Sequence, residues 1–504
     1  MTSSWCDFTI QTLSTEKSLP KLWFRADFDI IALLKGIKVF SKVLNGKYWY
    51  VFLLTPVVVW AVYAGIGVGR LHMYPNRLNY FKDLSVSFRQ GRLDIDNPYV
   101  GDLSVFKGKK YLYWPAVPAL VYMPLTALCG KNTPDTFIVG CFGALNVFLL
   151  MILLNLFSKR YELKLGHKGI VFLALFWGLG TVHFYMSMVG AVWYISQVMA
   201  QTFLMLSLVC ILMHTSLTTL FLSGLFYAMA VYTRNNLVFT IFLVVAIYIT
   251  KDKVGDKKIL IKQATIFLMP FVVFSLANLA YNWARFGNAF DNGINYHRLN
   301  PYFLNNFSIY GYMSLHYVPS NFVREVIMPP PFTTQFPYFE FDPKGCGLLW
   351  VSPIFIFIFA AAFYYKNGFN KHILKERANT VLSYNDVIVM SAAAISGILI
   401  SLVIFMVMST GWSQFASRYS LDYQLMMLLF SLFILKIWGK SKIFKAVLIA
   451  GLVISIYINY FGMRFFLAEH EKYYHQRFSN IQSTSGARGA VARKNNMFYT
   501  NFAV

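Results

Sequence analysis

Long apolar runs separated by short polar connections dominate this chain, and their lengths predict membrane-spanning helices. About 20 apolar residues in helical form cross the hydrocarbon core of a bilayer. Eleven runs are of this order, and they lie near residues 48–69, 136–157, 169–188, 190–213, 217–233, 236–250, 264–283, 347–365, 387–408, 419–438 and 446–463. We therefore expect an all-α polytopic membrane protein with about 11 transmembrane helices, in a transmembrane domain over residues 48–463.

One further apolar segment, residues 111–130, is ambiguous because it holds three prolines. Pro115, Pro118 and Pro124 would each disturb the backbone hydrogen bonding that lipid requires. The positive-inside rule provides an independent test. If the segment does not cross and the N-terminus is cytoplasmic, the cytoplasmic regions hold 24 of the 45 Lys and Arg residues. These regions are 1–47 and the connections near 158–168, 251–262, 366–386 and 436–445. We therefore predict that 111–130 dips into the membrane without crossing it.

The composition supports this fold class and excludes several others. Of the 504 residues, 57% are hydrophobic and 13% are charged, whereas soluble domains have about 25% charged residues. The net charge of +24 would suit nucleic acid only if the basic residues formed a dense soluble face. No glycine-rich phosphate loop and no close histidine cluster is present. Direct use of a nucleotide and a protein-built metal site are therefore not indicated.

The predicted topology places most of the hydrophilic sequence outside. A basic N-terminal segment, 1–47, is cytoplasmic; two long loops, about 70–135 and 284–346, are extracytoplasmic; and the tail 464–504 is extracytoplasmic and partly disordered. The outer side holds 12 of the 21 acidic residues when Asp422, at the outer end of its span, is included. The spans are nearly without carboxylates, which disfavours a proton-coupled transporter.

The first outer loop has three parts. Residues 79–90 carry apolar and basic residues at helical spacing and predict a juxtamembrane amphipathic helix. An acidic, turn-rich stretch follows, and then a basic-aromatic run over 107–114 leads into the proline-rich segment. A carboxylate beside cations and aromatic rings at a membrane surface suits a reaction between a sugar and a lipid-linked phosphate. The alternative is that these are ordinary solvated charges and an interfacial aromatic belt.

The order of several short motifs resembles the GT-C superfamily of membrane glycosyltransferases. The likeness is greatest to bacterial members of family 39, which includes protein O-mannosyltransferase and aminoarabinose transferase relatives. It extends over most of residues 50–425. The matching pieces are Phe88-x-x-Gly91-Arg92-Leu93, Gly101-Asp102, Gly108-x-x-Tyr111, Trp114-Pro115, Pro124-Leu125-x-x-Leu128-x-Gly130, Gly180-Thr181, Trp193-Tyr194, Gly224 to Arg234, Tyr281-Asn282-x-x-Arg285-Phe286-Gly287 and Gly411-Trp412-x-Gln414-Phe415-x-x-Arg418-Tyr419-x-x-Asp422.

This resemblance implies a GT-C-like fold and an inverting sugar transfer. A polyprenyl or dolichyl monophosphate carries the donor sugar, and an extracytoplasmic glycan, lipid or protein hydroxyl accepts it. A carboxylate of the first outer loop acts as general base, while cations stabilise the departing phosphate. No cofactor is certain; a divalent metal is possible but not indicated. The implied location is the bacterial plasma membrane with the site facing outside, rather than the endoplasmic reticulum.

One position departs from the family pattern. The usual aspartate directly after the first span falls on Asn76, and an amide cannot serve as a base. Either a neighbouring carboxylate has taken over, or the chain is not a catalyst of the usual kind. We favour Asp102 as base, followed by Asp83, Asp94 and Asp96, against the reading that Asp102 is an ordinary loop carboxylate.

The candidate phosphate ligands are ranked by their predicted position at the outer face. Arg234 lies between two spans, where it either contacts phosphate or snorkels to the interface. Arg418 either grips phosphate or pairs with Asp422 one helical turn later. Lys109, Lys110 and Arg285 are outside and are expected to be more exposed. The candidates for sugar or acceptor contact are Tyr111, Trp114, Trp193, Tyr194, Trp412 and Gln414.

Three functions are therefore compared. The leading one is a glycosyltransferase with a lipid-phosphate sugar donor. The second is a lipid or oligosaccharide transporter or flippase, which needs a continuous polar path through the spans. The third is a non-catalytic GT-C-like assembly subunit, which Asn76 keeps open. Convergence of Asp102 with Arg234 or Arg418 at the outer face would favour the enzyme.

Overall fold

The computed structural model describes most of the chain as helices. The described residues are 48–67, 78–97, 101–213, 216–251, 256–298, 301–340, 342–366, 382–411, 414–438 and 441–485. The predictions for segment 1–47, for Asn76, for Trp412 and for the last part of the tail, 486–504, fall outside these residues.

Seven helices among the described residues are long and apolar enough to cross a membrane. They are α2 (Trp49–Gly67), α5 (Asp135–Arg160), α8 (Val192–Met213), α11 (Lys257–Phe286), α17 (Tyr384–Phe405), α18 (Leu421–Trp438) and α19 (Lys442–Ser485). Four apolar segments form shorter helices, namely α6 (His167–Leu179), α9 (Leu217–Val231), η2 (Asn235–Thr240) continuing as α10 (Ile241–Ile249), and α15 (Ile354–Lys366). The predicted all-helical membrane fold is confirmed, while the count of 11 crossings stays a prediction. Helix α19 also runs well beyond the predicted end of its span at residue 463.

Helix ends follow local sequence signals. The first turn of α5 carries Asp135 and its last turn carries Lys159 and Arg160, which match the positive and negative ends of the helix dipole. Helices α9 and α17 each start with a capping box, led by Ser216 and Ser383, in which two orphan N–H groups are satisfied reciprocally.

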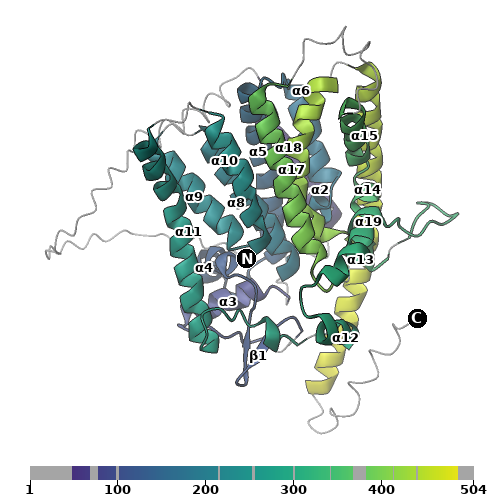
Figure 1. Ribbon diagram of the computed structural model, residues 1–504. Helices are drawn as coiled ribbons and strands as arrows, with labels where there is room; N and C mark the ends of the chain where they lie inside the picture. The colour runs from purple at the N-terminus through teal and green to yellow at the C-terminus, as the bar shows by residue number, and fades with distance from the viewer. Residues whose placement is uncertain are drawn as a thin grey trace, which may run out of the picture.

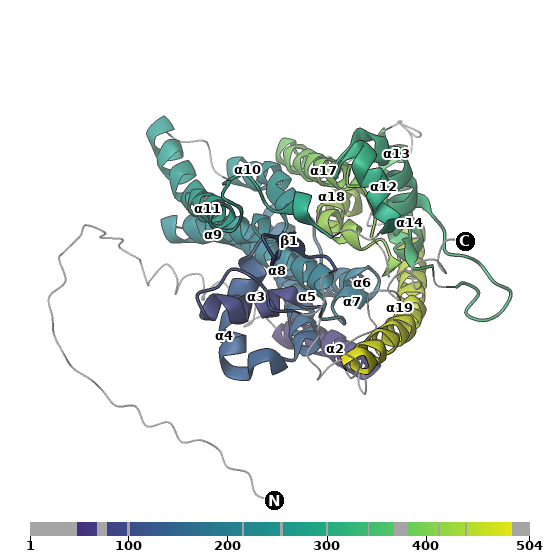
Figure 2. The same ribbon diagram turned by 90° about the horizontal axis from the view of Figure 1, so that it is seen from below.

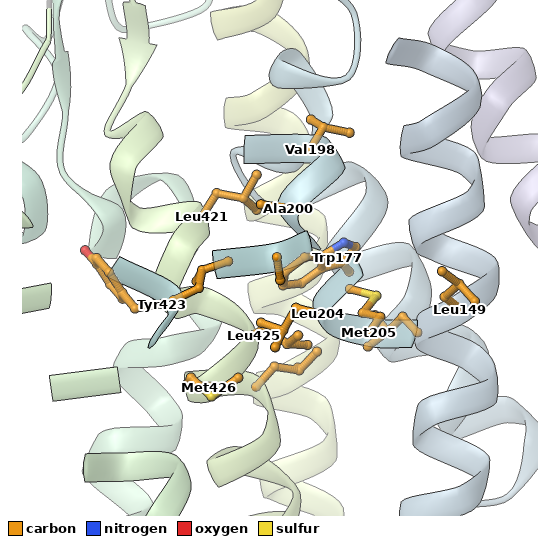
Figure 3. Packing of buried hydrophobic residues seen from close by; sticks show 14 of the residues in the cluster. Leu149, Trp177, Val198, Ala200, Leu204, Met205, Leu421, Tyr423, Leu425 and Met426 are labelled. Carbon is orange, nitrogen blue, oxygen red and sulfur yellow. The ribbon is translucent and has the colours of Figure 1, made fainter. Parts of the chain in front are cut away.

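Helix α8 forms the centre of the bundle. Seen from below in Figure 2, the other long helices surround it, and it packs against α5, α9, α10 and α18. Figure 3 shows Leu204 and Met205 of α8 lying between Leu149 of α5 and Leu425 of α18. Because α8 is buried nearly all round, most of its residues are apolar, as expected for an enclosed helix, and its few polar side chains, such as Gln197, are buried with them.

The first outer loop folds into a small layer at one end of the bundle. It contains α3 (Tyr80–Arg89), a hairpin of β1 (Ser104–Phe106) and β2 (Lys109–Tyr111), α4 (Val117–Cys129) and η1 (Gly130–Asn132). In Figure 1 these elements lie at the lower end, as does α12 (Pro301–Tyr310) of the second outer loop. The two predicted outer loops therefore gather at the same end of the protein.

The hairpin was missed in the sequence, although a signal for it exists. Its two-residue turn is Lys107-Gly108, and both residues have positive φ, +49° and +77°. Positive φ at both central positions is the type I′ geometry that fits the twist of antiparallel strands, and glycine adopts it without steric cost.

The proline-rich segment forms one short helix, α4. Its helix, α4, has 13 residues, or about 20 Å at 1.5 Å per residue, which is short of the roughly 30 Å hydrocarbon core. It packs against α3, where Arg89 donates to the Thr126 carbonyl at 2.6 Å. Pro118 lies in the first turn, and only Pro124 is inside the helix. Helices α6 and α15 also have 13 residues, so length alone does not decide a crossing, and the absence of one here stays a prediction.

The second outer loop is connected to the bundle by short irregular elements. Besides α12 it contains η3 (Ile294–Tyr296), η4 (Leu315–Tyr317), α13 (Val318–Phe322), the π-helical turn η5 (Val323–Ile327), β3 (Lys344–Cys346) and α14 (Leu348–Val351). Strand β3 pairs in parallel with β4 (Gln414–Ala416), which leads into η6 (Arg418–Ser420) and α18. The remaining short helix is α7 (His183–Met186). This pairing brings the second loop against the start of α18.

Small residues allow two of the helices to pack closely. Gly224 of α9 faces the Phe267 carbonyl of α11, so that an added Cβ would overlap that backbone. Gly65 of α2, in contrast, has no atom within 4 Å of an added Cβ. Close approach at small residues is a general device of helix packing in membranes.

We expect Gly224→Ala to destabilise the protein, because backbone cannot move aside as a side chain can. Overpacking costs about 1–3 kcal/mol, and the melting temperature in detergent should fall by several degrees. Gly65→Ala is the matched control, and its higher helix propensity should leave the melting temperature unchanged or slightly raised. Equal melting temperatures for the two variants would contradict this packing argument.

Candidate functional site

A buried ion pair joins α8, α18 and the segment before η2. Asp422 is fully buried at the start of α18, and its Oδ2 accepts from Arg234 Nη2 at 2.5 Å and Nε at 3.0 Å. Asn236 Nδ2 donates to the same oxygen at 2.8 Å, and Gln197 Nε2 donates to Oδ1 at 3.1 Å. Arg234 is therefore held by a carboxylate that the sequence analysis had considered as a partner of Arg418 instead.

Arg418 lies beside this pair in an aromatic enclosure. Its guanidinium carbon is 5.0 Å from the Tyr419 ring centroid, 5.7 Å from that of Trp193 and 5.9 Å from that of Tyr194. Gly411 closes one side with φ +95°, and an added Cβ there would lie 2.9 Å from the guanidinium carbon. Gln197 Nε2 also donates to the Arg418 carbonyl at 2.9 Å. The structure thus brings together three residues that the sequence had proposed separately: Arg418, Trp193 and Tyr194.

A carboxyl group that the sequence reasoning missed faces Arg418. Glu325 of η5 is buried, and its Oε2 accepts from the Ser417 hydroxyl. Burial raises the pKa of Glu325 to about 8, although the Ser417 hydrogen bond and the Arg418 charge act in the opposite direction. Its Oε1 is buried without a hydrogen-bond partner among the described residues. The available signal was a single acid, next to Arg324, in the turn Val323–Ile327.

Asp102 lies where the two outer loops meet. It has a left-handed backbone with φ +62°, which aspartate tolerates better than most residues. Next to it, Ser104 forms an isolated β-bridge with His297, and its hydroxyl donates to the Gly293 carbonyl at 2.7 Å. The backbone N–H of Arg298 donates to Leu103 at 3.2 Å. The His297 side chain consequently faces Asp102, with Nε2 3.6 Å from Oδ1.

Tyrosine side chains connect Asp102 electrostatically with the two arginines. Burial raises the pKa of Tyr113 well above 10; the negative potential of Asp102 adds to this, and the charge of Arg418 opposes it. The pKa of Tyr312 is likewise raised by burial and by Tyr419, and the charge of Arg234 opposes this. Tyr113 is therefore affected by the charges of both Asp102 and Arg418, and Tyr312 by the charge of Arg234. The convergence of Asp102 with Arg234 or Arg418 stays a prediction.

The other candidate carboxylates have different surroundings. Asp83 lies in α3 and accepts from Asn97 Nδ2 at 2.6 Å; burial raises the pKa of Asp83 to about 6. Asp94 forms an ion pair with Arg92 at 3.1 Å, and Asp96 is exposed. The described contacts of these three carboxylates lie within the first loop, and none of those contacts is with Arg234 or Arg418.

A second buried ion pair fixes α3 to α5. Asp135 is fully buried, and it accepts from Lys82 Nζ at 2.6 Å and from Asn79 Nδ2 at 2.7 Å. Asn79 also caps α3 by accepting from the backbone N–H of Lys82. This cluster positions the first outer loop on the bundle, and the sequence reasoning missed it.

The remaining candidate cations serve different roles. Lys109 is exposed on the hairpin, whereas Lys110 Nζ donates to the Asn97 carbonyl. Arg285, which was expected to be exposed, is buried: its Nη1 donates to the Leu112 carbonyl at 2.5 Å and its guanidinium carbon lies 3.8 Å from the Tyr281 ring centroid. Arg285 thus attaches the first outer loop to α11.

The aromatic and amide candidates are similarly divided. Tyr111 packs edge-on against Phe286, and Trp114 stacks on Tyr113 with ring centroids 4.6 Å apart. Gln414 is buried in β4, and its Nε2 donates to the carbonyls of Lys344 and Thr410. Gln414 therefore holds the strand pair, which is a structural role. Within the described residues, no group of three or more His, Cys, Asp or Glu side chains is placed to bind a metal ion.

The chain resembles solved structures of one archaeal membrane enzyme. Against the apo Archaeoglobus fulgidus oligosaccharyltransferase, the TM-score is 0.46 at 12% identity, covering 84% of this chain and 56% of the other. Against that enzyme tethered to an acceptor peptide containing an NVT sequon, it is 0.47 at 13% identity, covering 84% and 55%. The complex of that protein, AglB, with an inhibitory peptide and a dolichol-phosphate gives 0.48 at 12% identity, covering 83% and 56%.

This likeness is distant and partial. The chain spans little more than half the length of those structures, and at these TM-scores the likeness decides neither the family nor the reaction. No protein-family model matches the chain, and no curated protein matches it. The functional argument consequently rests on the residues themselves.

The buried Glu325 predicts a dependence of stability on pH. The folded carboxyl keeps its proton up to about pH 8, whereas the unfolded one loses it near its ordinary value of 4.5. The unfolded state therefore binds fewer protons in this interval, and stability falls as pH rises, by at most about 1.4 kcal/mol per pH unit. Glu325→Gln removes this dependence.

We expect Glu325→Gln to melt higher than the original protein at pH 8 and close to it at pH 5, in detergent. Glu340→Gln, an exposed carboxylate of the same loop, is the matched control and should show no such difference. A constant difference in melting temperature across this pH range would contradict the assignment.

Proposed function

We propose that this protein is a membrane glycosyltransferase that uses a lipid-phosphate-linked sugar as donor. The observation that carries the proposal is that Arg234 and Arg418 lie over the same ring, with their guanidinium carbons 5.7 Å and 5.0 Å from the Tyr419 centroid. Asp102, which is partly exposed at the junction of the two outer loops, supplies the carboxylate. The ordered motifs that resemble the GT-C superfamily support it, because Asp102, Arg234 and Arg418 all belong to those motifs.

The arginines suit a phosphate group at this position. A guanidinium presents a planar set of N–H donors that matches phosphate oxygens, and it stays charged when buried. The rings around Arg418 fix its plane while leaving its charge in place, as in cation–π contacts generally. Glu325 is neutral below about pH 8 and so does not cancel this charge at neutral pH.

Asp102 is the proposed base. It is the candidate carboxylate that lies in the same neighbourhood as Arg418, and its side chain is 33% exposed, so that a substrate can reach it. In the proposed step, the acceptor oxygen attacks the anomeric carbon opposite the phosphate and its proton passes to Asp102. The bond between the anomeric carbon and the phosphate oxygen breaks with its electron pair, and the arginines stabilise the departing charge.

The scope of the proposal is set by this chemistry. The donor is a polyprenyl- or dolichyl-phosphate sugar, and the acceptor is a hydroxyl of a glycan, a lipid or a protein on the extracytoplasmic side. A transporter needs a continuous polar path through the bundle, whereas polar side chains there can be buried against one another. Asn146 and His183, for example, are fully buried and contact each other at 3.3 Å.

We expect Arg418→Ala to reduce kcat/KM about 10²–10³-fold, the usual effect of removing one preorganised donor to a developing charge. The assay uses the protein in proteoliposomes with radiolabelled polyprenyl-phosphate hexoses and pentoses, and measures release of polyprenyl phosphate. Asp102→Asn should reduce kcat by a similar factor.

The matched control is Lys168→Ala, which removes an exposed cation from the start of α6. It should keep the original rate. Full activity of Asp102→Asn would remove Asp102 from the mechanism, and absence of donor turnover by the original protein with every sugar would refute the proposed function.

A further inference from the structure

His297 is the side chain that faces Asp102 across the junction of the outer loops. It comes from the second loop directly after η3, where Ile294 carbonyl accepts from its backbone N–H. The bridge with Ser104 and the Ser104–Gly293 hydrogen bond fix the backbone on both sides of the gap. The 3.6 Å separation between Nε2 and Oδ1 is therefore set by two paired backbone segments rather than by a mobile side chain.

The imidazole is buried with its hydrogen-bonding capacity unused. The His297 side chain is 7% exposed, and neither Nδ1 nor Nε2 has a hydrogen-bond partner among the described residues. Buried polar atoms in native proteins are nearly always paired. The 3.6 Å separation exceeds the usual hydrogen-bond distance and is that of an ion-pair contact when the imidazole carries a proton. It leaves no room for a water molecule on the line between the two atoms, so Asp102 and His297 face each other directly.

The titratable and charged groups near His297 come from both outer loops and from the segment before α18. Tyr113 covers the imidazole, with ring centroids 4.7 Å apart, and burial raises the pKa of its hydroxyl well above 10, so it stays neutral. Beyond Tyr113 lie Tyr312, Tyr419 and Arg418. On its own segment His297 is flanked by Tyr296, which hydrogen-bonds to Asp291, and by Arg298.

We propose that Asp102 and His297 form a proton relay for the sugar transfer, in which His297 is a positioning residue that acts through Asp102. The inference rests on the proposed function. The acceptor O–H proton passes to the Asp102 carboxylate as the oxygen–carbon bond forms, and then to the His297 imidazole. The carbon–phosphate oxygen bond breaks with its electron pair, and the phosphate leaves as the anion held by the arginines. Loss of the proton from His297 to water restores the pair.

A purely structural role for His297 predicts different behaviour. The backbone bridge to Ser104 does not need the imidazole, so a structural histidine would affect folding or donor affinity but not the protonation step. A metal site is also a poor fit, because two ligands are too few for the usual three or four.

The test compares the pH dependence of kcat/KM between the original protein and His297→Gln, from pH 5 to 9. The assay is polyprenyl phosphate release in proteoliposomes. We expect kcat of His297→Gln to fall about 10²-fold, and the pH profile to change because the imidazole no longer takes part in the proton transfer. Binding of polyprenyl phosphate, measured by competition with the donor, should change less than threefold.

Two further variants make the test decisive. His316→Gln, an exposed histidine in the same loop, is the matched control and should keep both rate and profile. The double variant Asp102→Asn/His297→Gln should be no slower than Asp102→Asn alone, since residues that act as a unit are not additive. An unchanged pH profile in a folded His297→Gln protein, or additive losses, would overturn the relay while leaving the glycosyltransferase proposal intact. A lack of donor turnover by the original protein would overturn both.

Discussion

The buried pair of Arg234 and Asp422 is the interaction on which the rest of the candidate site depends. Burying two charges costs several kcal/mol per ion, and the cost is recovered only when the geometry is good and the remaining polar atoms are satisfied. Here Asn236 and Gln197 complete the carboxylate. Removing Asp422 alone would therefore leave a buried, unbalanced guanidinium rather than a more reactive one.

Gln197 extends this constraint to Arg418. Its single amide nitrogen donates to both the Asp422 carboxylate and the Arg418 carbonyl, so the central helix α8 holds the backbone of η6 in register with the ion pair. Gly411 and the three rings then set the plane of the guanidinium. The orientation of the Arg418 guanidinium, the proposed phosphate ligand, therefore depends on Gln197, which lies one helical turn after Trp193 on the enclosed helix α8.

Local signals in the sequence predicted the elements well and their long-range contacts poorly. The apolar runs predicted the helices, the spacing of residues 79–90 predicted α3, and proline content separated α4 from the spans. Arg234 and Arg418 were selected as phosphate candidates from their positions at helix ends. The contact of Arg234 with Asp422 was not predicted, because Asp422 lies 188 residues away and no periodicity reports such a contact.

The same limit explains the missed residues. His297, Glu325 and Asp135 carry no motif, and each acquires its role only from a partner in another segment: Asp102, Ser417 and Lys82 respectively. Conversely, Arg285 and Gln414 lie within recognisable motifs, yet the structure uses their side chains to hold backbone carbonyls. Burial and hydrogen-bond partners distinguish a residue that can bind substrate from one that only supports the fold, and local sequence does not reveal either of them.

The two outer loops each contribute half of the candidate proton-transfer pair, so the pair exists only when the loops are docked together. Arg285 holds the first loop through the Leu112 carbonyl, and Ser104 joins it to Gly293 of the second loop. Both anchors lie close in sequence to the groups they position. An exposed carboxylate alone would be a weak base with no fixed acceptor for the proton that it takes up. A carboxylate that faces a buried imidazole can pass its proton to that imidazole. The structural residues of this junction therefore have a chemical consequence, because they set the distance over which that proton must move.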